Sequence, residues 1–262
     1  MTARRLVGVL GGMGPLATVD FMRKVIDATP AERDQDHVPM LVHAVPQIAD
    51  RTAAIATGSD EPFRALLAGL RILERSGVAL VAMPCNTAHA WFDRLAGSTD
   101  VELLHIADAV RRRIGRAPDR PSEAIALMAT TGTVRAGFYQ RYLTTTAPER
   151  RMIAPSPAIQ SGIMAAIEAV KAGDLAAAGE RAGQAAEALL AAGADRLLLA
   201  CTELPIALRG TALATRCVDA TACLAEACVA FSLGLDGTSD QAPAQLAERG
   251  ADAWTSVGSR IS

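Results

Sequence analysis

This 262-residue chain has few aromatic residues and no large excess of acidic or basic residues. Phe, Trp and Tyr make up 3% of it, and 26 basic against 28 acidic residues leave a formal net charge of −2. Because a nucleic-acid surface needs basic residues for the phosphates and aromatic rings for stacking, this composition argues against nucleic-acid binding. Half of the residues are hydrophobic, which supplies a large core and excludes a disordered chain.

Long hydrophobic runs are absent as well. No apolar stretch reaches the ~18 residues that a membrane-spanning helix needs. The first residues, two arginines followed by Leu6–Leu10, resemble a short signal peptide, but the apolar part stops at Gly11 and Gly12. We therefore expect a cytoplasmic protein that does not contact a membrane.

Cysteine pairs and metal-ligand spacings are also missing. The five cysteines are an odd number, none forms a Cys-x-x-Cys pair, and the four histidines form no ligand pair at helical spacing. This usage predicts reduced thiols and no structural metal. The cysteines are Cys85, Cys201, Cys217, Cys223 and Cys228.

Lysine is nearly absent, since 24 arginines accompany only two lysines, Lys24 and Lys171. A codon bias toward arginine accounts for this imbalance. A lysine that persists in such a chain is nevertheless a candidate for a specific role.

Short apolar segments alternate with longer amphipathic, alanine-rich stretches along the chain. The apolar segments, which predict strands, are Leu6–Leu10, Met40–Val45, Val78–Met83, Glu102–Ile106, Ala124–Met128, Leu197–Ala200 and Cys217–Val218. The amphipathic stretches, which predict helices, include Pro15–Ala28, Pro62–Ser76, Ala107–Ile114, Ile163–Ala172 and Leu175–Ala192. Strand alternating with helix predicts an α/β fold whose mostly parallel sheets are covered on both faces.

The pattern contains an internal repeat. Leu6–Gly14 and Ile125–Thr133 are both apolar strands that run into a turn, and Gly77–Cys85 and Gly193–Cys201 both run from glycine to cysteine across seven residues. Spacings within the two copies agree to within a few residues. We therefore predict two similar α/β halves related by a pseudo-twofold axis, each with one cysteine at a strand end.

The joint between the halves is expected in the Arg-, Gly- and Pro-rich stretch 114–122. The strand and helix at 216–233 repeat the pattern of 101–114, so we expect them to cross back to the first half. The predicted division is a first domain of residues 1–107 plus 211–234 that carries Cys85, a second domain of residues 108–210 that carries Cys201, and a polar C-terminal tail of residues 235–262.

Cys85 and Cys201 each follow a predicted parallel strand and precede a predicted helix start. Ligands of open parallel sheets bind at the carboxyl ends of the strands, so two facing halves would place these thiols on opposite walls of one cleft. A helix N-terminus favours the thiolate and attracts a carboxylate. Nearby side-chain donors are Asn86, Thr87, Thr131 and Thr202.

Two opposed thiols favour one reaction class. A thiolate removes a proton from one face of a carbon atom, and a thiol returns a proton to the other face, so the carbon is inverted without a cofactor. This is the chemistry of a racemase or epimerase. A lone cysteine is more often a small buried hydrophobe, and we expect Cys217, Cys223 and Cys228 to be that.

Several segments together resemble the aspartate/glutamate racemase family, most closely its aspartate racemase branch. They are Gly11–Pro15, Pro46–Thr52, Pro84–His89, Thr131–Thr133 and Cys201–Glu203. The resemblance covers roughly residues 5–232, and Pro-Cys-Asn-Thr-Ala-His with a later Cys-Thr-Glu is its specific part. Ala49 departs from the proline that many relatives carry in the Pro46–Thr52 segment.

The resemblance implies two Rossmann-like domains, racemisation without pyridoxal phosphate or another cofactor, and a homodimer. It implies that Cys85 and Cys201 are catalytic and that Arg51 binds the side-chain carboxylate of the substrate with help from Lys171. The alternatives are a surface ion pair of Arg51 with Asp50 or Asp60, and a solvated helix end for Lys171. Candidate substrate-binding residues are Met13, Arg51, Asn86, Thr87, Thr131, Thr133, Lys171 and Thr202. The expected reaction is interconversion of L- and D-aspartate, with glutamate or broad specificity as alternatives.

Other functions also fit parts of the sequence. Gly12, Gly14 and Ala17 fit a loose dinucleotide fingerprint, but no acidic residue ends the next strand. The spacing of Cys85 and His89 fits a nucleophile pair of a hydrolase or transferase. A dicarboxylate cis–trans isomerase keeps both cysteines, and a non-catalytic binding protein would need neither thiol.

Overall fold

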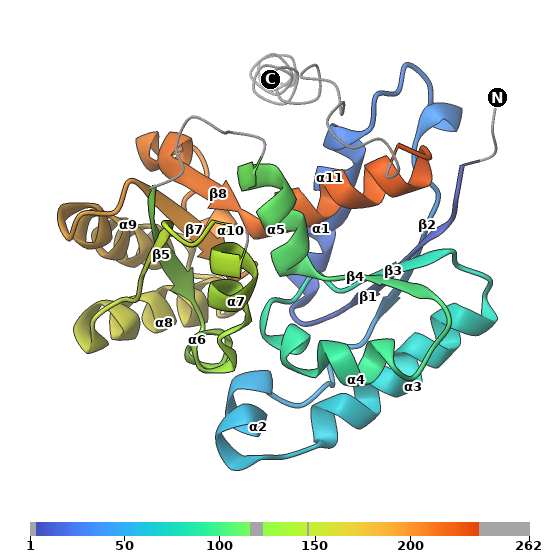
Figure 1. Cartoon of the computed structure of the whole chain (residues 1–262), viewed down its shortest axis with the longest axis horizontal. Helices are drawn as coiled ribbons and strands as arrows, with labels where there is room; N and C mark the ends of the chain where they lie inside the picture. The colour runs from blue at the N-terminus through green and yellow to red at the C-terminus, as the bar shows by residue number, and fades with distance from the viewer. Residues whose placement is uncertain (1–3, 116–122, 146, 236–262) are drawn as a thin grey trace.

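Two four-stranded parallel sheets dominate the computed structural model, which describes residues 4–115, 123–145 and 147–235. The first sheet has the order β2-β1-β3-β4, and its strands are β1 (Val7–Gly11), β2 (Met40–Ala44), β3 (Leu80–Ala82) and β4 (Glu102–Leu104). The second has the order β6-β5-β7-β8, with strands β5 (Ala124–Ala129), β6 (Arg151–Ile153), β7 (Arg196–Ala200) and β8 (Cys217–Asp219). The identical strand order confirms the predicted α/β fold with two similar halves (Figure 1).

Helices connect the strands and flank both sheets. In the first half they are α1 (Pro15–Ala28), α2 (Arg51–Thr57), α3 (Glu61–Arg75), α4 (Phe92–Ala96) and α5 (Ile106–Gly115), with 3₁₀ turns η1 (Asp34–Asp36) and η2 (Thr87–Trp91). In the second they are α6 (Thr131–Ala136), α7 (Phe138–Thr145), α8 (Pro157–Lys171), α9 (Leu175–Ala191), α10 (Leu204–Ala207) and α11 (Ala220–Ser232), with η3 (Ala212–Arg216). None of the described helices is both long and apolar enough to cross a membrane.

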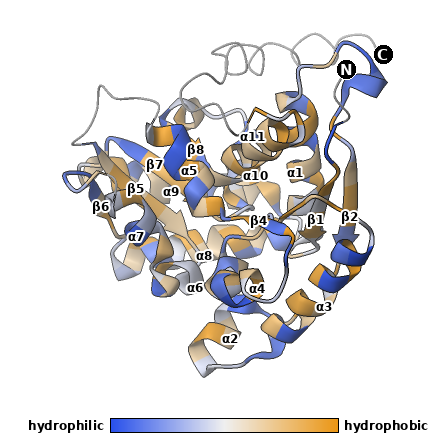
Figure 2. Ribbon diagram, turned by 45° about the vertical axis from the view of Figure 1, so that its right-hand side comes forward, coloured by the Kyte–Doolittle hydropathy of each residue, from blue (hydrophilic) through white to orange (hydrophobic). Residues whose placement is uncertain are grey.

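The two faces of each sheet pack into different cores. Val7 and Val9 of β1 lie in a core that also contains Ile125 of β5 and Leu198 of β7, so this core is shared by the two halves. Leu10, from the opposite face of β1, packs in a core of the first half alone. Burial on both faces explains why the central strands β1, β3, β5 and β7 read as continuous apolar runs. Figure 2 shows hydrophobic colours along β5 and β7.

The last helix of each half packs against the other half. Helix α11 follows β8 of the second sheet but packs against α1, whereas α5 follows β4 of the first sheet and packs against α7 (Figure 1). Helices α5 and α11 also contact each other. We expected residues 211–234 in the first domain. Strand β8 of this segment instead lies in the second sheet, and only helix α11 packs against the first half.

Candidate active site

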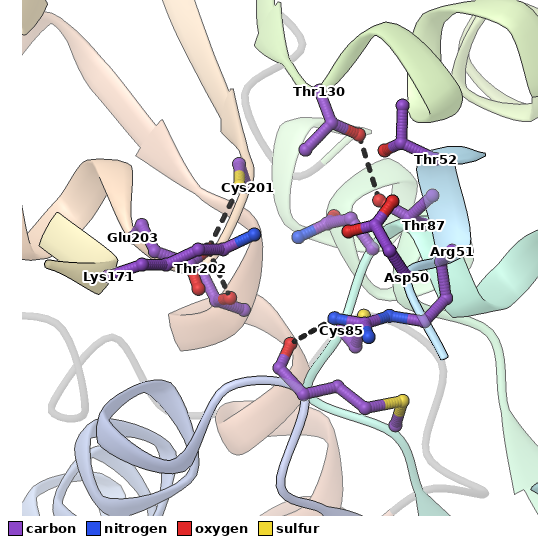
Figure 3. A pocket seen from close by; sticks show the side chains of 12 residues that line it. Asp50, Arg51, Thr52, Cys85, Thr87, Thr130, Lys171, Cys201, Thr202 and Glu203 are labelled. Carbon is purple, nitrogen blue, oxygen red and sulfur yellow. Dashed lines mark hydrogen bonds between the residues drawn. The ribbon is translucent and has the colours of Figure 1, made fainter. Parts of the chain in front are cut away.

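A small pocket opens between the two halves, at the carboxyl ends of both sheets. Met13 follows β1, Cys85 follows β3, Thr130 follows β5 and Cys201 follows β7. The full lining is Met13, Asp50, Arg51, Thr52, Cys85, Asn86, Thr87, Thr130, Lys171, Cys201, Thr202 and Glu203. Figure 3 shows Cys85 and Cys201 on different walls of this pocket.

Cys85 is held in place by the short turn that follows β3. Its backbone N–H donates to the Met83 carbonyl at 2.8 Å, and the residue is 4% exposed. The next residue, Asn86, accepts a 2.5 Å hydrogen bond at Oδ1 from the hydroxyl of Tyr139, which belongs to the second half. The Asn86 Nδ2 group is buried and has no hydrogen-bond partner among the described residues. A donor beside the first thiol is therefore free for a ligand.

His89 does not form a nucleophile pair with the Cys85 thiol. Its Nδ1 lies 3.1 Å from the carbonyl oxygen of Cys85, and its ring stacks on Phe92. Burial lowers the pKa of His89 to about 4, so the ring is neutral at neutral pH and cannot form an imidazolium–thiolate pair. The geometry therefore argues against the hydrolase or transferase alternative.

Cys201 lies beside a buried carboxylate. Its Sγ donates to Oε2 of Glu203 at 3.0 Å, and the Thr202 hydroxyl donates to the same oxygen at 3.0 Å. Burial and then the charge of Glu203 raise the pKa of the Cys201 thiol well above its ordinary value, and the charge of Lys171 acts in the opposite sense. The expected lowering of the pKa by a helix N-terminus is not found here, because burial and then the Glu203 carboxylate raise the pKa, and α10 has only four residues.

Arg51 is the first residue of α2, whose N-cap Asp50 accepts a 2.8 Å hydrogen bond from the Ala53 N–H. The Arg51 guanidinium donates to three backbone carbonyls, at 3.1 Å to Ile48, 3.2 Å to Ala49 and 3.4 Å to Met13. Its Nε is buried without a hydrogen-bond partner in the described part of the chain. The carbonyls orient the cation, while an N–H group stays available to an anion.

Neither expected ion pair of Arg51 is formed. Asp50 caps its helix, and Asp60 instead pairs with Arg94 at 2.6 Å and 3.0 Å. The surface ion-pair interpretation of Arg51 is therefore wrong.

The two lysines of the chain occupy different kinds of place. Lys171, at the end of α8, directs its ammonium group into the pocket (Figure 3). Lys24 of α1 pairs with Asp20 at 2.5 Å and with Asp219 at 2.6 Å. Because Asp20 also pairs with Arg209 at 2.7 Å, this network joins α1 to the second half. One lysine thus carries charge into the pocket, and the other connects the halves.

Three threonines join the halves beneath the pocket. The Thr87 hydroxyl lies 2.8 Å from that of Thr130 and 3.0 Å from that of Thr133. Thr133 is buried behind the lining, and Thr131 is exposed, with its N–H donating to the sulfur of Met164. Thr131 and Thr133 were predicted to bind the substrate, but they do not line the pocket. Thr130, the N-cap residue of α6, lines it in their place.

Four lining residues were not among the sequence-based candidates: Asp50, Thr52, Thr130 and Glu203. Glu203 belongs to the Cys-Thr-Glu segment and Asp50 precedes Arg51, so both lay within motifs already identified. Thr130 could have been found as the N-cap that opens the turn after β5. Thr52 is the last residue of the Pro46–Thr52 segment, and it lines the pocket where α2 packs beside α6.

The glycine turn after β1 is built for packing. Gly12 has φ +92°, and a Cβ there would lie 2.3 Å from the Val45 nitrogen. The Gly12 N–H donates to the Thr18 hydroxyl at 2.8 Å, so it is not offered to a phosphate. This geometry argues against the dinucleotide alternative. In the described residues, no three His, Cys, Asp or Glu side chains gather to hold a metal.

A larger, mostly apolar hollow adjoins the pocket. It lies between the start of α1 and the end of α8, and it shares Asp50, Arg51, Lys171 and Glu203 with the inner pocket. The inner pocket therefore has charged groups at its mouth and apolar surface outside them.

The chain is similar to known amino-acid racemases. The family model described as Asp/Glu/Hydantoin racemase matches residues 10–228. The aspartate racemase of Picrophilus torridus is 31% identical, with a TM-score of 0.77, over 88% of this chain and 94% of that one. The broad-specificity amino-acid racemase RacX of Bacillus subtilis is 28% identical over 234 residues, which are 87% of this chain and 98% of that protein.

A more distant structure shares the fold alone. Glutamate racemase RacE1 of Bacillus anthracis is 14% identical with a TM-score of 0.63, over 89% of this chain and 84% of that one. The family match spans both pocket cysteines and both pocket cations. The chain belongs to the Asp/Glu/hydantoin racemase family.

Proposed function

We propose that this protein interconverts L- and D-aspartate without a cofactor, using Cys85 and Cys201 as the two acid–base groups. The observation that carries the proposal is their placement: two buried thiols at equivalent strand ends of two repeated halves, on different walls of one pocket. A single catalytic thiol would not need this duplication.

Inversion follows from proton transfer on two faces of the α-carbon. One cysteine, as thiolate, takes the α-proton, and the C–H electron pair stays on the substrate as a carbanion-like centre. The other cysteine, as thiol, gives its proton to the opposite face and becomes the thiolate. Positioned proton transfer of this kind contributes roughly 10²–10⁴-fold to a rate. Fixed donors around the carbanion supply further stabilisation, because a confined pocket strengthens each of them.

The charges of the pocket favour a diacid. Arg51 keeps a buried Nε–H without a partner in the described residues, and Lys171 brings a second cation to the same pocket. We assign the side-chain carboxylate of aspartate to these two cations, and the α-carboxylate to the buried Nδ2 of Asn86. A neutral amino acid would leave a partly buried cation without its anion, which is costly.

Broad specificity is the second candidate, favoured by the apolar hollow outside the charged mouth. A substrate with a longer apolar side chain could extend into it. The Bacillus subtilis relative that matches over nearly its whole length is a broad-specificity racemase.

The deciding experiment is proton NMR of L-aspartate with the purified protein in D₂O, followed by chiral chromatography. We expect the α-proton signal to disappear while D-aspartate accumulates. Exchange with several neutral amino acids at rates comparable to or above that of aspartate would favour the second candidate. No exchange with any amino acid, together with conversion of maleate into fumarate, would replace the proposal by the cis–trans isomerase alternative.

A further inference from the structure

We propose that Glu203 is a positioning residue that keeps Cys201 in the thiol form in the substrate-free protein, which leaves Cys85 to begin the reaction as the base. The inference rests on the proposed function, because it assigns unequal starting roles to the two cysteines of that reaction.

The contact that carries the inference is direct. The Cys201 Sγ donates a hydrogen bond to Oε2 of Glu203 at 3.0 Å. Figure 3 marks hydrogen bonds of this pocket with dashed lines. Glu203 is 4% exposed, and the same oxygen accepts from the Thr202 hydroxyl at 3.0 Å. A thiol can donate to this carboxylate but a thiolate cannot, so the hydrogen bond exists only in the protonated form.

The two cysteines are unequal in this respect. The repeat aligns Cys201, Thr202 and Glu203 with Cys85, Asn86 and Thr87, so a neutral hydroxyl stands where the second half has a carboxylate. The Thr87 hydroxyl faces Thr130 and Thr133 instead of the Cys85 thiol. Among the described residues, no carboxylate hydrogen-bonds the Cys85 sulfur.

Other charges around the pocket do not cancel this asymmetry. Lys171 at the end of α8 lowers the pKa of Cys201, but burial and Glu203 together outweigh it and raise that pKa. Asp50 and Arg51 of the α2 segment also line the pocket. In the described part of the chain, Glu203 makes no ion pair with Lys171 or Arg51. No described cation in direct contact therefore neutralises the carboxylate that lies beside the Cys201 thiol.

The asymmetry has a consequence for turnover. After inversion by the starting form, Cys85 holds the proton taken from the substrate, and Cys201 is a thiolate beside the Glu203 carboxylate. Two adjacent negative charges repel each other, so Cys201 regains a proton from water readily while Cys85 releases one to water. Protons balance over the cycle, and no other reactant is needed. Glu203 therefore returns the protein to the form in which Cys85 is the base.

Alkylation rates measure the thiolate fraction of each cysteine without requiring activity. We would treat wild type and Glu203→Gln with iodoacetamide at pH 7.5 and quantify the modified Cys85 and Cys201 peptides by mass spectrometry. Since removal of a neighbouring charge lowers a pKa by about one unit or more, Cys201 should react roughly tenfold faster in the variant. Glu187→Gln, an exposed substitution on α9, is the control and should change neither rate. An unchanged or slower reaction of Cys201 in Glu203→Gln would overturn the proposal.

A second measurement uses the wild-type protein alone, so it does not depend on folding of the variant. The rate of Cys201 alkylation should keep rising over a higher pH range than the rate of Cys85 alkylation. The shape of each profile is compared, which removes differences in reagent access. Coinciding profiles, or a Cys201 profile at lower pH, would reject the role of Glu203. Absence of α-proton exchange in wild type would instead reject the proposed function, so the two failures are distinguishable.

Discussion

The surroundings of each sulfur distinguish the pocket cysteines from the core cysteines in this chain, since burial does not. Cys85, Cys201, Cys223 and Cys228 are all buried. Cys223 and Cys228 lie inside the shared core on α11, where burial raises the pKa of each thiol. Cys85 and Cys201 are as little exposed and each packs in the core of one half, but both also line the pocket beside its polar groups. Position at a strand end, visible in the sequence, was therefore the useful signal.

Serine at either pocket cysteine should abolish racemisation. Cys85→Ser and Cys201→Ser replace a thiol by a hydroxyl that is far less acidic, so we expect at least a ~10²-fold fall in turnover for each. The assay is chiral chromatography of aspartate at equal protein concentration.

Cys217→Ser is the matched control for both variants. The Cys217 sulfur donates to the Leu213 carbonyl at 3.2 Å, which a serine hydroxyl can also do, and the residue lies outside the pocket. Turnover should stay near wild type. Near-normal turnover in Cys85→Ser or Cys201→Ser would contradict the two-base mechanism.

Removal of the Lys171 charge should affect diacids selectively. A hydrogen bond to a charged group contributes about 1.5–3 kcal/mol, so Lys171→Gln should lower kcat/KM for aspartate by roughly 10–100-fold. Exchange of the α-proton of a neutral amino acid should change much less. Arg75→Gln, an exposed cation on α3, is the control and should leave both unchanged. Equal losses for aspartate and for a neutral substrate would argue against a side-chain anchor.

Positions in the pocket were predictable from the sequence only where a reactive group or a recognised motif marked the residue. Both cysteines, Arg51 and Lys171 lie in the pocket as expected. The partner of Cys201 was not predicted, although Glu203 stood in a quoted motif, because its effect depends on a distance between two side chains. Distances of this kind follow from the path of the chain after β7, which periodicity does not specify.

Strands and long helices were predicted well because burial imposes a clear pattern on them. Every apolar segment named as a strand is one, and α1 spans the predicted residues. Two kinds of element were missed. Strand β6 has only three residues and begins with Arg151, so it has no apolar run. Helix α6 contains Thr131, Gly132 and Thr133, a sequence of low helix propensity. It forms because Thr130 caps it and because it packs between α2 and the η2 turn.

Close packing at α6 makes Gly132 sensitive to substitution. A Cβ there would lie 2.9 Å from the Thr52 Cα and 2.9 Å from the Thr87 Cγ2. We expect Gly132→Ala to push α2 away from α6, to destabilise the protein by about 1–3 kcal/mol, and to weaken substrate binding. Thermal unfolding and KM for aspartate are the measurements.

The matched control is Gly183→Ala in the interior of α9. A Cβ at Gly183 meets no atom within 4 Å, so the substitution should stabilise the helix by about 0.5–1 kcal/mol. If both variants stabilised the protein equally, the packing described at Gly132 would be incorrect.

The whole molecule is held together by surfaces that belong to neither half alone. Although the chain has few aromatic residues, a cluster of rings joins the halves. The ring of His105 stacks on that of Tyr142, with centroids 4.3 Å apart, and lies edge-on to Phe138 at 5.3 Å. The ring of His89 lies edge-on to His105 at 4.8 Å. The repeat in the sequence predicted two halves. It did not predict this cluster of rings, because no single histidine or aromatic residue stands in a sequence pattern that indicates a contact with the other half.

Acid should destabilise the protein through this cluster. Burial lowers the pKa of His89 to about 4 and, with the charge of His89, lowers that of His105 to about 2. In the unfolded chain both histidines have a pKa near 6.5. The free energy of unfolding is therefore unaffected by them above pH 6.5, and it falls as the pH drops from 6.5 toward their lower pKa values in the folded protein. At pH 5 the loss amounts to about 2 kcal/mol per histidine.

Urea unfolding at several pH values tests this expectation. The free energy of unfolding should fall steadily between pH 6.5 and pH 4, and His105→Asn should show about half of that slope. A slope that is the same in wild type and variant would show that other groups cause the acid sensitivity.

The exchange of last helices has a consequence for how the chain can be divided. A fragment that ends after α5 would leave Ile106, Val110 and Ile114 without cover and would lack the helix that packs on α1. The remaining fragment would have the converse defect, with α11 bare and α7 uncovered. Neither piece covers its own packing faces, but each carries the missing layer of the other. Two such fragments made in the same cell would have to assemble before a pocket existed, so recovery of catalysis would report their association.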